Sequence, residues 1–284
     1  MTDYKYQVFS LMLCVALTAT SQTANAQESW KKEKPHTQES IWDKEKWEIA
    51  IGAGASYEPK YEGSDNMEVQ AMPYFSIEWN NRVFLSPGDG LGVYIYNDDD
   101  LAISTSIGYD GGRDESDDKV NLRGLGDIDG AATANLGIEY DLGFTEPFID
   151  ISKHLGGSNG LQIEVGAETM MPLAALLGNQ NTTEDRHGPA FVFGVSAEWT
   201  DGNYTSEYFG VTSAQSTRSG LDEYDAGSGF KSVDAEIGFL YPITQRWSLL
   251  TSVEYSQLVG DAADSPIVKD DGQFSTGAFV TYKF

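Results

Sequence analysis

Apolar and polar side chains alternate from Trp47 to the end of the chain, in stretches separated by breaks rich in Gly, Asp, Asn and Pro. In the first stretch, 47–57, the apolar face begins with Trp47, ends with Tyr57 and carries Ile49 and Ile51 between them. Because successive side chains of a β-strand point to opposite faces, the stretch predicts a strand with one apolar face. Aromatic residues at both ends of such a face are typical of strands that cross a bilayer.

The same pattern predicts an all-β fold, a single antiparallel transmembrane β-barrel of about twelve strands that occupies residues 47–284. The short pair 82–86 and 90–96 is weakly patterned, so ten strands is the alternative. The expected strands are 47–57, 68–79, 82–86, 90–96, 101–110, 128–141, 146–155, 160–172, 189–200, 230–241, 246–258 and 273–284.

An even number of strands places both ends of the barrel on the periplasmic side. The long segments 58–67, 111–127, 201–229 and 259–272 then become extracellular loops, and the short breaks become periplasmic turns. The exception is 173–188, which this order makes a long periplasmic loop with an apolar run at 173–177.

The final segment, 273–284, carries Phe274, Val280 and Tyr282 on one face and stops at Phe284. A terminal aromatic residue on an alternating strand resembles the signal by which barrel-assembly machinery recognises its clients. We expect this strand to pair with 47–57, because an open edge in lipid would leave backbone groups without partners.

The predicted inward face is acidic. Lys and Arg are nearly absent from this face. Arg246 and Lys283 do fall on it, but both lie near the periplasmic rim. Unpaired charges in a dry interior would cost several kcal/mol each, so we predict a hydrated interior that favours cations. The inward acids are Glu48, Glu78, Glu139, Asp141, Glu164, Glu168, Glu198, Asp234, Glu236 and Glu254.

The N-terminal region predicts export. Lys5, an apolar run at 8–19 and the sequence Ala24-Asn25-Ala26 form a signal peptide over 1–26, and 27–46 reads as a flexible periplasmic tail. The only cysteine, Cys14, falls within the signal. We therefore expect a bacterial outer-membrane protein in contact with lipid and lipopolysaccharide.

Charge and residue usage narrow the function. A net charge of −26 argues against nucleic acid as a partner. Of the histidines, only His154, which shares a strand face with Ser152, could begin a catalytic triad, and no nucleophile motif surrounds it. The acid clusters 98–100, 114–118 and 270–271 lack the spacing of a calcium loop. We predict no catalytic, cofactor-binding or metal-binding residues.

Four loop segments carry a family resemblance. Residues 57–65 read YEPKYEGSD, and 111–115 (GGRDE) are followed by 122–128 (LRGLGDI). Further along, 208–211 (YFGV) precede 214–216 (AQS) and 219–221 (SGL), and 260–268 read GDAADSPIV. In this order the segments resemble the MipA/OmpV family, the MltA-interacting outer-membrane proteins.

The resemblance implies a scaffold without catalytic residues or cofactor, which links a lytic transglycosylase to a bifunctional peptidoglycan synthase in murein assembly. Other members of the family look porin-like, so a small cation-favouring porin is the alternative function.

Overall fold

The computed structural model describes residues 46–178 and 188–284. The predicted signal, 1–26, and all of the predicted tail except Lys46 lie outside the described residues. None of the helices in the described ranges is long and apolar enough to cross a membrane.

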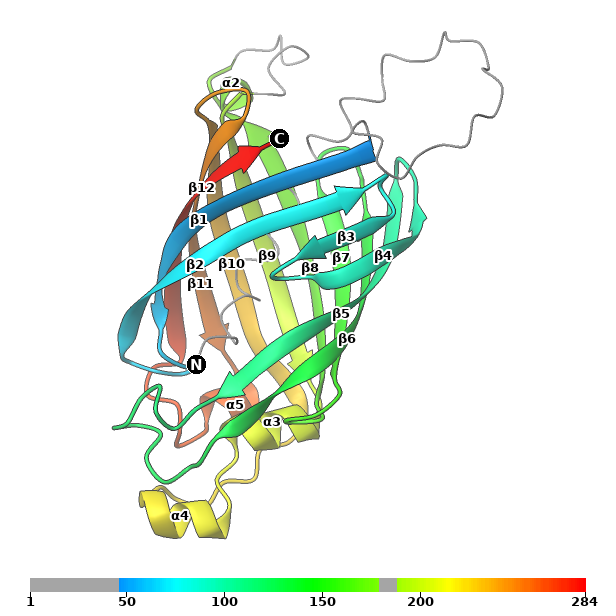
Figure 1. Ribbon diagram of the computed structural model, residues 1–284. Coiled ribbons are helices and arrows are strands. Elements are labelled where there is room, and N and C mark those ends of the chain that lie inside the picture. The colour runs from blue at the N-terminus through cyan, green and yellow to red at the C-terminus, as the bar shows by residue number, and fades with distance from the viewer. Residues whose placement is uncertain (1–45, 179–187) are drawn as a thin grey trace, which may run out of the picture.

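Within these ranges the strands form one closed antiparallel barrel, in which each strand pairs with its neighbours in sequence and the last pairs with the first (Figure 1). The prediction of twelve strands is confirmed, including the weakly patterned short pair. The strands are β1 (Trp47–Pro59), β2 (Met67–Trp79), β3 (Val83–Ser86), β4 (Gly90–Asn97), β5 (Leu101–Arg113), β6 (Ile128–Tyr140), β7 (Glu146–His154), β8 (Leu161–Pro172), β9 (Ala190–Thr200), β10 (Gly229–Pro242), β11 (Trp247–Leu258) and β12 (Gly272–Lys283).

The closing contact is the predicted one between β12 and β1. Their register runs from Tyr57 opposite Thr276 to Ala50 opposite Lys283, and the backbone N–H of Phe284 donates to Ile49 O at 3.0 Å. Phe284 is 68% exposed, as expected of a residue that meets lipid. No edge is therefore left between the first and last strands.

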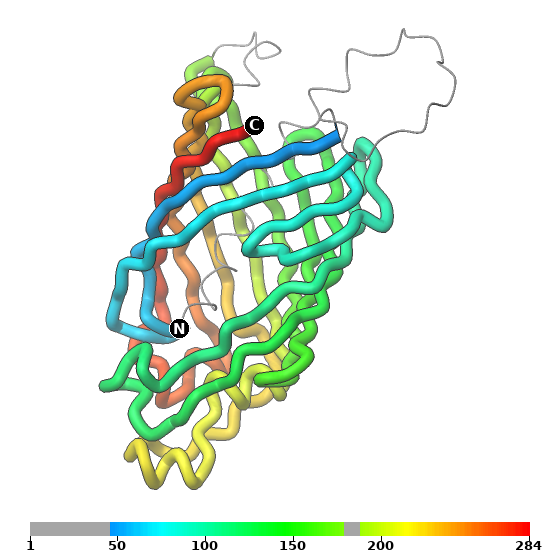
Figure 2. The backbone as a smooth tube through the Cα atoms, viewed as in Figure 1, coloured from blue at the N-terminus to red at the C-terminus, as the bar shows by residue number. Residues whose placement is uncertain are grey.

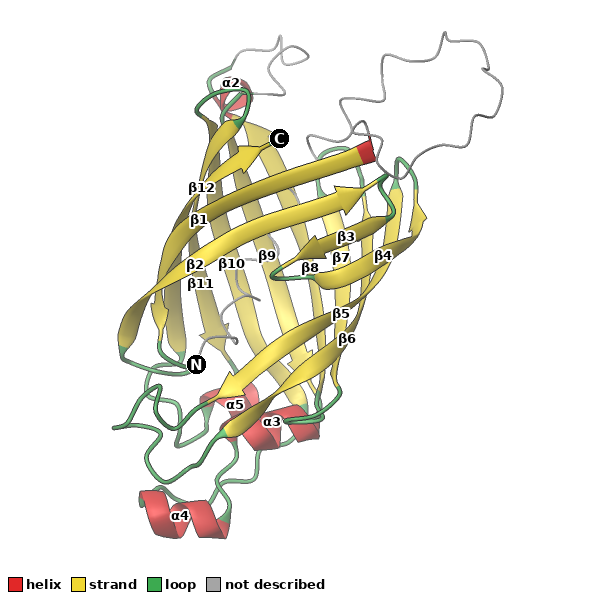
Figure 3. Ribbon diagram, viewed as in Figure 1, coloured by secondary structure: helices red, strands yellow, loops and turns green. Residues whose placement is uncertain are grey.

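The two ends of the barrel differ (Figure 3). One end carries the short turns, the chain terminus and α2 (Leu173–Leu176), which begins the connection from β8 to β9. The other end carries the long loops with α3 (Gly202–Phe209), α4 (Ser213–Ser219) and α5 (Gly260–Ala263). Because outer-membrane barrels keep their turns short on the periplasmic side, the helical end faces outward. The predicted division of long loops and short turns between the two ends of the barrel is confirmed.

The inward face is partly filled by an apolar row. Inward side chains of five neighbouring strands meet in register, and Gly54 leaves the space that the Phe279 ring occupies, since a Cβ at Gly54 would lie 2.4 Å from Phe279 Cδ1. The row consists of Leu240, Leu250, Phe279, Gly54 and Met72. These residues narrow the lumen on one side of the barrel, and Met72 and Phe279 also line the volume that remains open.

The wall is incomplete between β2 and β5. Strand β3 pairs with β2 only from Ile77 to Trp79, and the pairing of β4 with β5 stops at Leu91 opposite Ile107. No described strand pairs with Met67–Ser76 or with Gly108–Arg113 on the facing sides. Figures 1 and 2 both show β2 and β5 diverging beyond the tip of the β3–β4 hairpin, toward the helical end of the barrel. We call this opening the β2–β5 gap.

Candidate functional site in the capped acidic lumen

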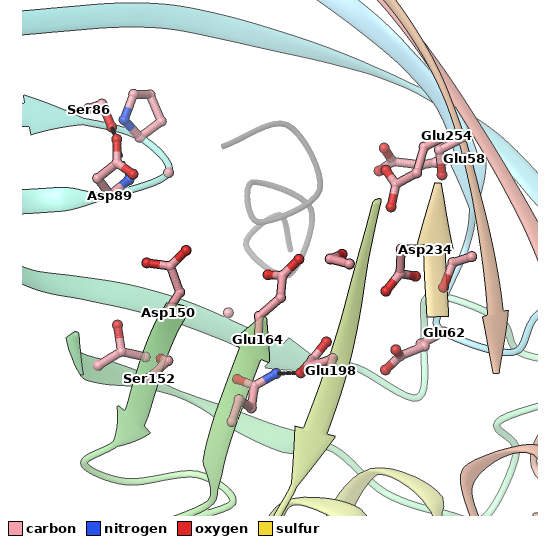
Figure 4. A pocket seen from close by; sticks show the side chains of 18 of the residues that line it. Glu58, Glu62, Ser86, Asp89, Asp150, Ser152, Glu164, Glu198, Asp234 and Glu254 are labelled. Atoms are coloured by element: carbon pink, nitrogen blue, oxygen red, sulfur yellow. Dashed lines mark hydrogen bonds between the residues drawn. The ribbon is translucent and has the colours of Figure 1, made fainter. Parts of the chain in front are cut away.

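A cavity of about 800 Å³ lies inside the barrel. Carboxylates from several strands and from the β3–β4 hairpin face it: Asp150, Glu164 and Glu198 project from adjacent strands, with Asp89 opposite them (Figure 4). The predicted acidic lumen is therefore present in the structure. Of the acids predicted to face inward, Glu48 and Asp141 lie outside the cavity lining, toward the periplasmic rim.

The carboxylates are arranged in cross-strand rows. In the first row, Glu146 of β7 lies opposite Glu168 of β8, and Glu236 of β10 lies opposite Glu254 of β11. Gly194 of β9 separates the two pairs, because it is the partner of both Glu168 and Glu236. Like charges directly opposite one another destabilise a sheet. A cation held in the cavity would relieve this repulsion.

Glu168 stands out within the first row. It is 3% exposed, and neither oxygen of its carboxylate has a hydrogen-bond partner among the described residues. A buried polar group without a partner is costly, and a buried carboxylate especially so. Its position on the cavity wall makes this carboxylate available to a group that enters the cavity.

The second row contains a cation. Asp150 lies opposite Glu164, and Glu164 lies opposite Glu198. Lys231 Nζ lies 2.6 Å from Glu198 Oε2 and 2.8 Å from Glu62 Oε1 of the first extracellular loop. This buried lysine therefore joins the barrel wall to the loop.

Sequence reasoning missed Lys231, because strict alternation would place its side chain outside with Val233. The pairing of β10 with β9 shifts register between Phe230 and Ser232, and Lys231 and Ser232 are both buried. The extra residue of such a β-bulge turns a side chain to the other face. Periodicity alone carries no signal for this shift.

His154 belongs to the same polar region and not to a triad with Ser152. Gln162 Nε2 donates to Glu198 Oε1 at 2.6 Å, which leaves Gln162 Oε1 to accept from His154 Nε2 at 2.8 Å. His154 Nδ1 then accepts from Ser158 Oγ at 3.1 Å. With both ring nitrogens engaged and 1% of the residue exposed, His154 holds the end of β7 in place.

The extracellular loops form a cap over the cavity, built from the four segments that carry the family resemblance. Tyr61 Oη donates to Ile267 O at 2.9 Å, which joins the first segment to the fourth. Ser265 Oγ of the fourth donates to Phe209 O of the third at 2.6 Å. Arg113 Nη1 of the second donates to Tyr208 O at 2.6 Å. Segments far apart in sequence thus meet in one structure.

Two apolar clusters hold the cap together. One includes Tyr204, Tyr208 and Phe209 of α3 with Leu258 and Ala262, and the other includes Tyr61, Leu122, Leu125, Val211 and Ile267. Gly63 permits a close approach, because its φ is +92° and a Cβ there would lie 2.6 Å from Val268 Cγ2. Tyr61, Tyr208 and Phe209 also line the cavity, so the cap forms its ceiling.

Asp118 is a polar centre of the cap. Its Oδ2 accepts from Asn66 Nδ2 at 2.9 Å and from Asn121 Nδ2 at 3.0 Å, and its Oδ1 accepts from the backbone N–H groups of Val120 and Asn121. Burial acts to raise the pKa of Asp118, but these hydrogen bonds outweigh it and hold the pKa below its ordinary value. This loop acid is thus a structural acceptor.

Among the described residues, no group of three or more His, Cys, Asp or Glu side chains is placed to hold a metal ion. Of the acid clusters noted in the sequence, 114–118 is used within the cap. Asp114 N–H donates to Asp117 Oδ2 at 2.9 Å, and Glu115 Oε2 accepts from Gly126 N–H at 3.0 Å.

Solved structures with a similar fold include outer-membrane barrels. The NanC porin aligns with a TM-score of 0.45 at 8% identity over 82% of this chain and 100% of the porin. An outer membrane channel from Pseudomonas putida F1 aligns with a TM-score of 0.42 at 11% identity over 89% of this chain and 100% of the channel.

Sequence relatives are more informative. The MltA-interacting protein of Escherichia coli (strain K12) is 28% identical over 84% of this chain and 90% of its own length. The outer membrane protein Omp26La of Vibrio anguillarum is 26% identical over 72% of this chain and 70% of its own length. The outer membrane protein OmpV of Vibrio cholerae is 25% identical over 79% of this chain and 76% of its own length.

The family model described as MltA-interacting protein MipA matches residues 51–284, which include all of the cap and nearly all of the barrel. The resemblance found in the loops is therefore confirmed. This chain is an outer-membrane β-barrel that belongs to the MipA family of MltA-interacting proteins.

Proposed function

We propose that this barrel is a non-enzymatic docking protein that holds a lytic transglycosylase at the periplasmic face of the outer membrane. The observation that carries the proposal is the family match across residues 51–284, together with a relative named for its interaction with MltA. Following the family resemblance, we further propose that a bifunctional peptidoglycan synthase joins the same assembly.

The contact surface should lie at the periplasmic end, where a murein enzyme would be. Most connections there are tight turns, and α2 is the helix among the described residues at that end (Figure 3). Leu176 is 48% exposed and the next residue, Leu177, is 77% exposed. Adjacent exposed leucines on a projecting element suit a protein contact. We propose this pair as part of the docking surface.

Affinity capture from gently solubilised envelopes tests the proposal. With the mature protein as bait, we expect to recover a lytic transglycosylase, with a peptidoglycan synthase in the same fraction. The control bait is an unrelated outer-membrane barrel of similar size. Recovery of other porins alone, with no murein enzyme above the control, would contradict the docking function.

The carboxylate rows favour a second candidate function, a small cation-favouring porin. The cavity walls carry an excess of acids over bases. Among the described residues, the buried cations Lys231 and Arg113 bond to Glu198 and to Tyr208 O. In planar bilayers under a salt gradient, we expect conductance with a reversal potential whose sign shows that cations pass more readily than anions. Glu236→Gln should reduce that preference. Absence of conductance, or anion preference, would contradict this function.

A further inference from the structure

The cavity reaches the wall of the barrel at the β2–β5 gap. A strand in a complete wall shows alternate residues to the lumen, as β6 does with Thr133, Asn135, Gly137 and Glu139. Strand β2 instead contributes every residue from Glu68 to Tyr74 to the cavity lining. Both faces of β2 therefore border the open volume. The β2–β5 gap is thus a side window into the cavity, and this part of β2 forms its rim.

The side window lies at a definite depth. Val69 is opposite Tyr57 and Trp79 is opposite Trp47, so β2 runs from the outer aromatic girdle to the periplasmic one. On the side that faces β3, β2 has no partner from Met67 to Ser76, and the residues 69–73 lie in the outer half of the strand. A molecule that passes through the side window would come from the outer leaflet of the membrane.

The rim of the window is apolar. Val69 is 73% exposed and Tyr109, on the β5 side, is 61% exposed, and both line the cavity together with Ala71 and Pro73. Proline has no backbone N–H, so Pro73 removes one donor that would otherwise lack a partner at this edge. Such a rim suits an alkyl chain.

The cavity wall behind the side window is acidic, in contrast to the apolar rim. Glu168, which is 3% exposed and without hydrogen-bond partners for its carboxylate, faces the cavity across Gly194 from Glu236. A Cβ at Gly194 would lie 3.7 Å from Glu168 Cγ and 3.7 Å from Glu236 Cβ, so glycine keeps the space between the two acids narrow but open. A positively charged head group placed there would give the buried Glu168 carboxyl group a partner that the protein does not supply.

We propose that the side window admits amphiphilic ammonium compounds from the outer leaflet, with the alkyl tail in the window and the cationic head against Glu168 and Glu236. The cap forms the ceiling of the cavity, which favours entry from the side. The inference rests on the cation-accepting lumen proposed above and is independent of murein docking.

The test uses the mature protein in phosphatidylcholine nanodiscs and two styrylpyridinium dyes with the same cationic head, one carrying a dodecyl tail and one a methyl group. A parallel fluorescence titration of empty nanodiscs measures how much dye partitions into lipid alone, and this signal is subtracted. We expect the tailed dye to bind at least about ten-fold more tightly than the methyl dye. Glu168→Gln should weaken both dyes by about ten-fold, which is ~1.4 kcal/mol.

A matched pair of variants tests the route. Ala71→Trp places a bulky side chain at the rim, and Ala278→Trp places the same side chain on an exposed wall position that pairs with strands on both sides. We expect Ala71→Trp to slow association of the tailed dye by about ten-fold and Ala278→Trp to leave it unchanged. Heat-modifiable gel migration shows that each variant is folded.

The outcomes separate the two proposals. Equal association rates for Ala71→Trp and Ala278→Trp would overturn the side window as the route. Binding of the methyl dye without the tailed dye would overturn the proposal that the ligand is amphiphilic, while leaving the cation-accepting lumen in place. Failure of both dyes to bind, or full binding by Glu168→Gln, would overturn the site.

Discussion

Replacing Lys231 with Met should destabilise the barrel because it removes the buried cation that bonds to the largely buried carboxylates of Glu198 and Glu62. Lys231 is 5% exposed, lies 2.6 Å from Glu198 and 2.8 Å from Glu62, and sits 5.4 Å from the centre of the Tyr204 ring. Removing one partner of a buried ion pair typically costs about 3–5 kcal/mol. We expect a loss of that size in the free energy of unfolding, measured by urea titration of the protein folded into lipid vesicles.

The chain offers a matched control. Lys283 Nζ lies 2.7 Å from Glu48 Oε2, but the two side chains are 37% and 29% exposed. Because solvent screens such a pair, Lys283→Met should cost less than about 1 kcal/mol. Adding Glu198→Gln to Lys231→Met should restore part of the lost stability. A loss below about 1 kcal/mol for Lys231→Met, or a double variant no more stable than the single one, would refute the reasoning.

Three further predictions concern the cap, the last strand and the cavity. The folded-state pKa of Asp118 is lowered, so the stability that its carboxylate gives the cap is complete above the unfolded pKa of about 3.9 and is lost as pH falls through the folded value. Amide hydrogen exchange of residues 61–66, corrected for the intrinsic rate, should therefore rise below about pH 4 in the wild type. The change should be smaller in Asp118→Asn. Deleting Phe284 should lower outer-membrane yield, since it removes the exposed terminal ring and the bond to Ile49 O at 3.0 Å; normal yield would contradict its role in assembly. Glu168→Met should stabilise the empty barrel by about 1–3 kcal/mol in urea titrations, because it replaces a buried carboxyl group that has no hydrogen-bond partner with an apolar side chain of similar size; an unchanged or lower midpoint would argue against that.

The wall of the barrel was predictable because one physical rule governs every strand. Each strand must present apolar side chains to lipid and can present polar ones to the lumen. Alternation such as that of Val233, Asp234, Ala235 and Glu236 therefore identifies both the strand and its two faces. Even the short strands β3 and β4 were visible in this pattern. Their shortness, which made the strand count uncertain, is also what opens the β2–β5 gap.

The cap and the lysine bridge were not predictable in the same way. Loops have no periodicity, and contacts such as Tyr61 with Ile267 join residues 206 positions apart, so only the folded barrel brings them together. Lys231 was hidden because the bulge at Phe230/Ser232 breaks the rule that assigned every other inward residue of β10. The loop segments that carry the family resemblance thus build the cap over the lumen.

The central claim, docking of a murein hydrolase at the periplasmic end, is tested most directly by binding between purified components. The protein in nanodiscs is immobilised, and a purified lytic transglycosylase is passed over it by interferometry. We expect a Kd of about 10 μM or tighter, weakened at least ten-fold by Leu176→Gln with Leu177→Gln and unchanged by Val120→Gln, whose residue is 82% exposed in an extracellular loop. No binding at about 100 μM, or equal binding by all three proteins, would contradict the account.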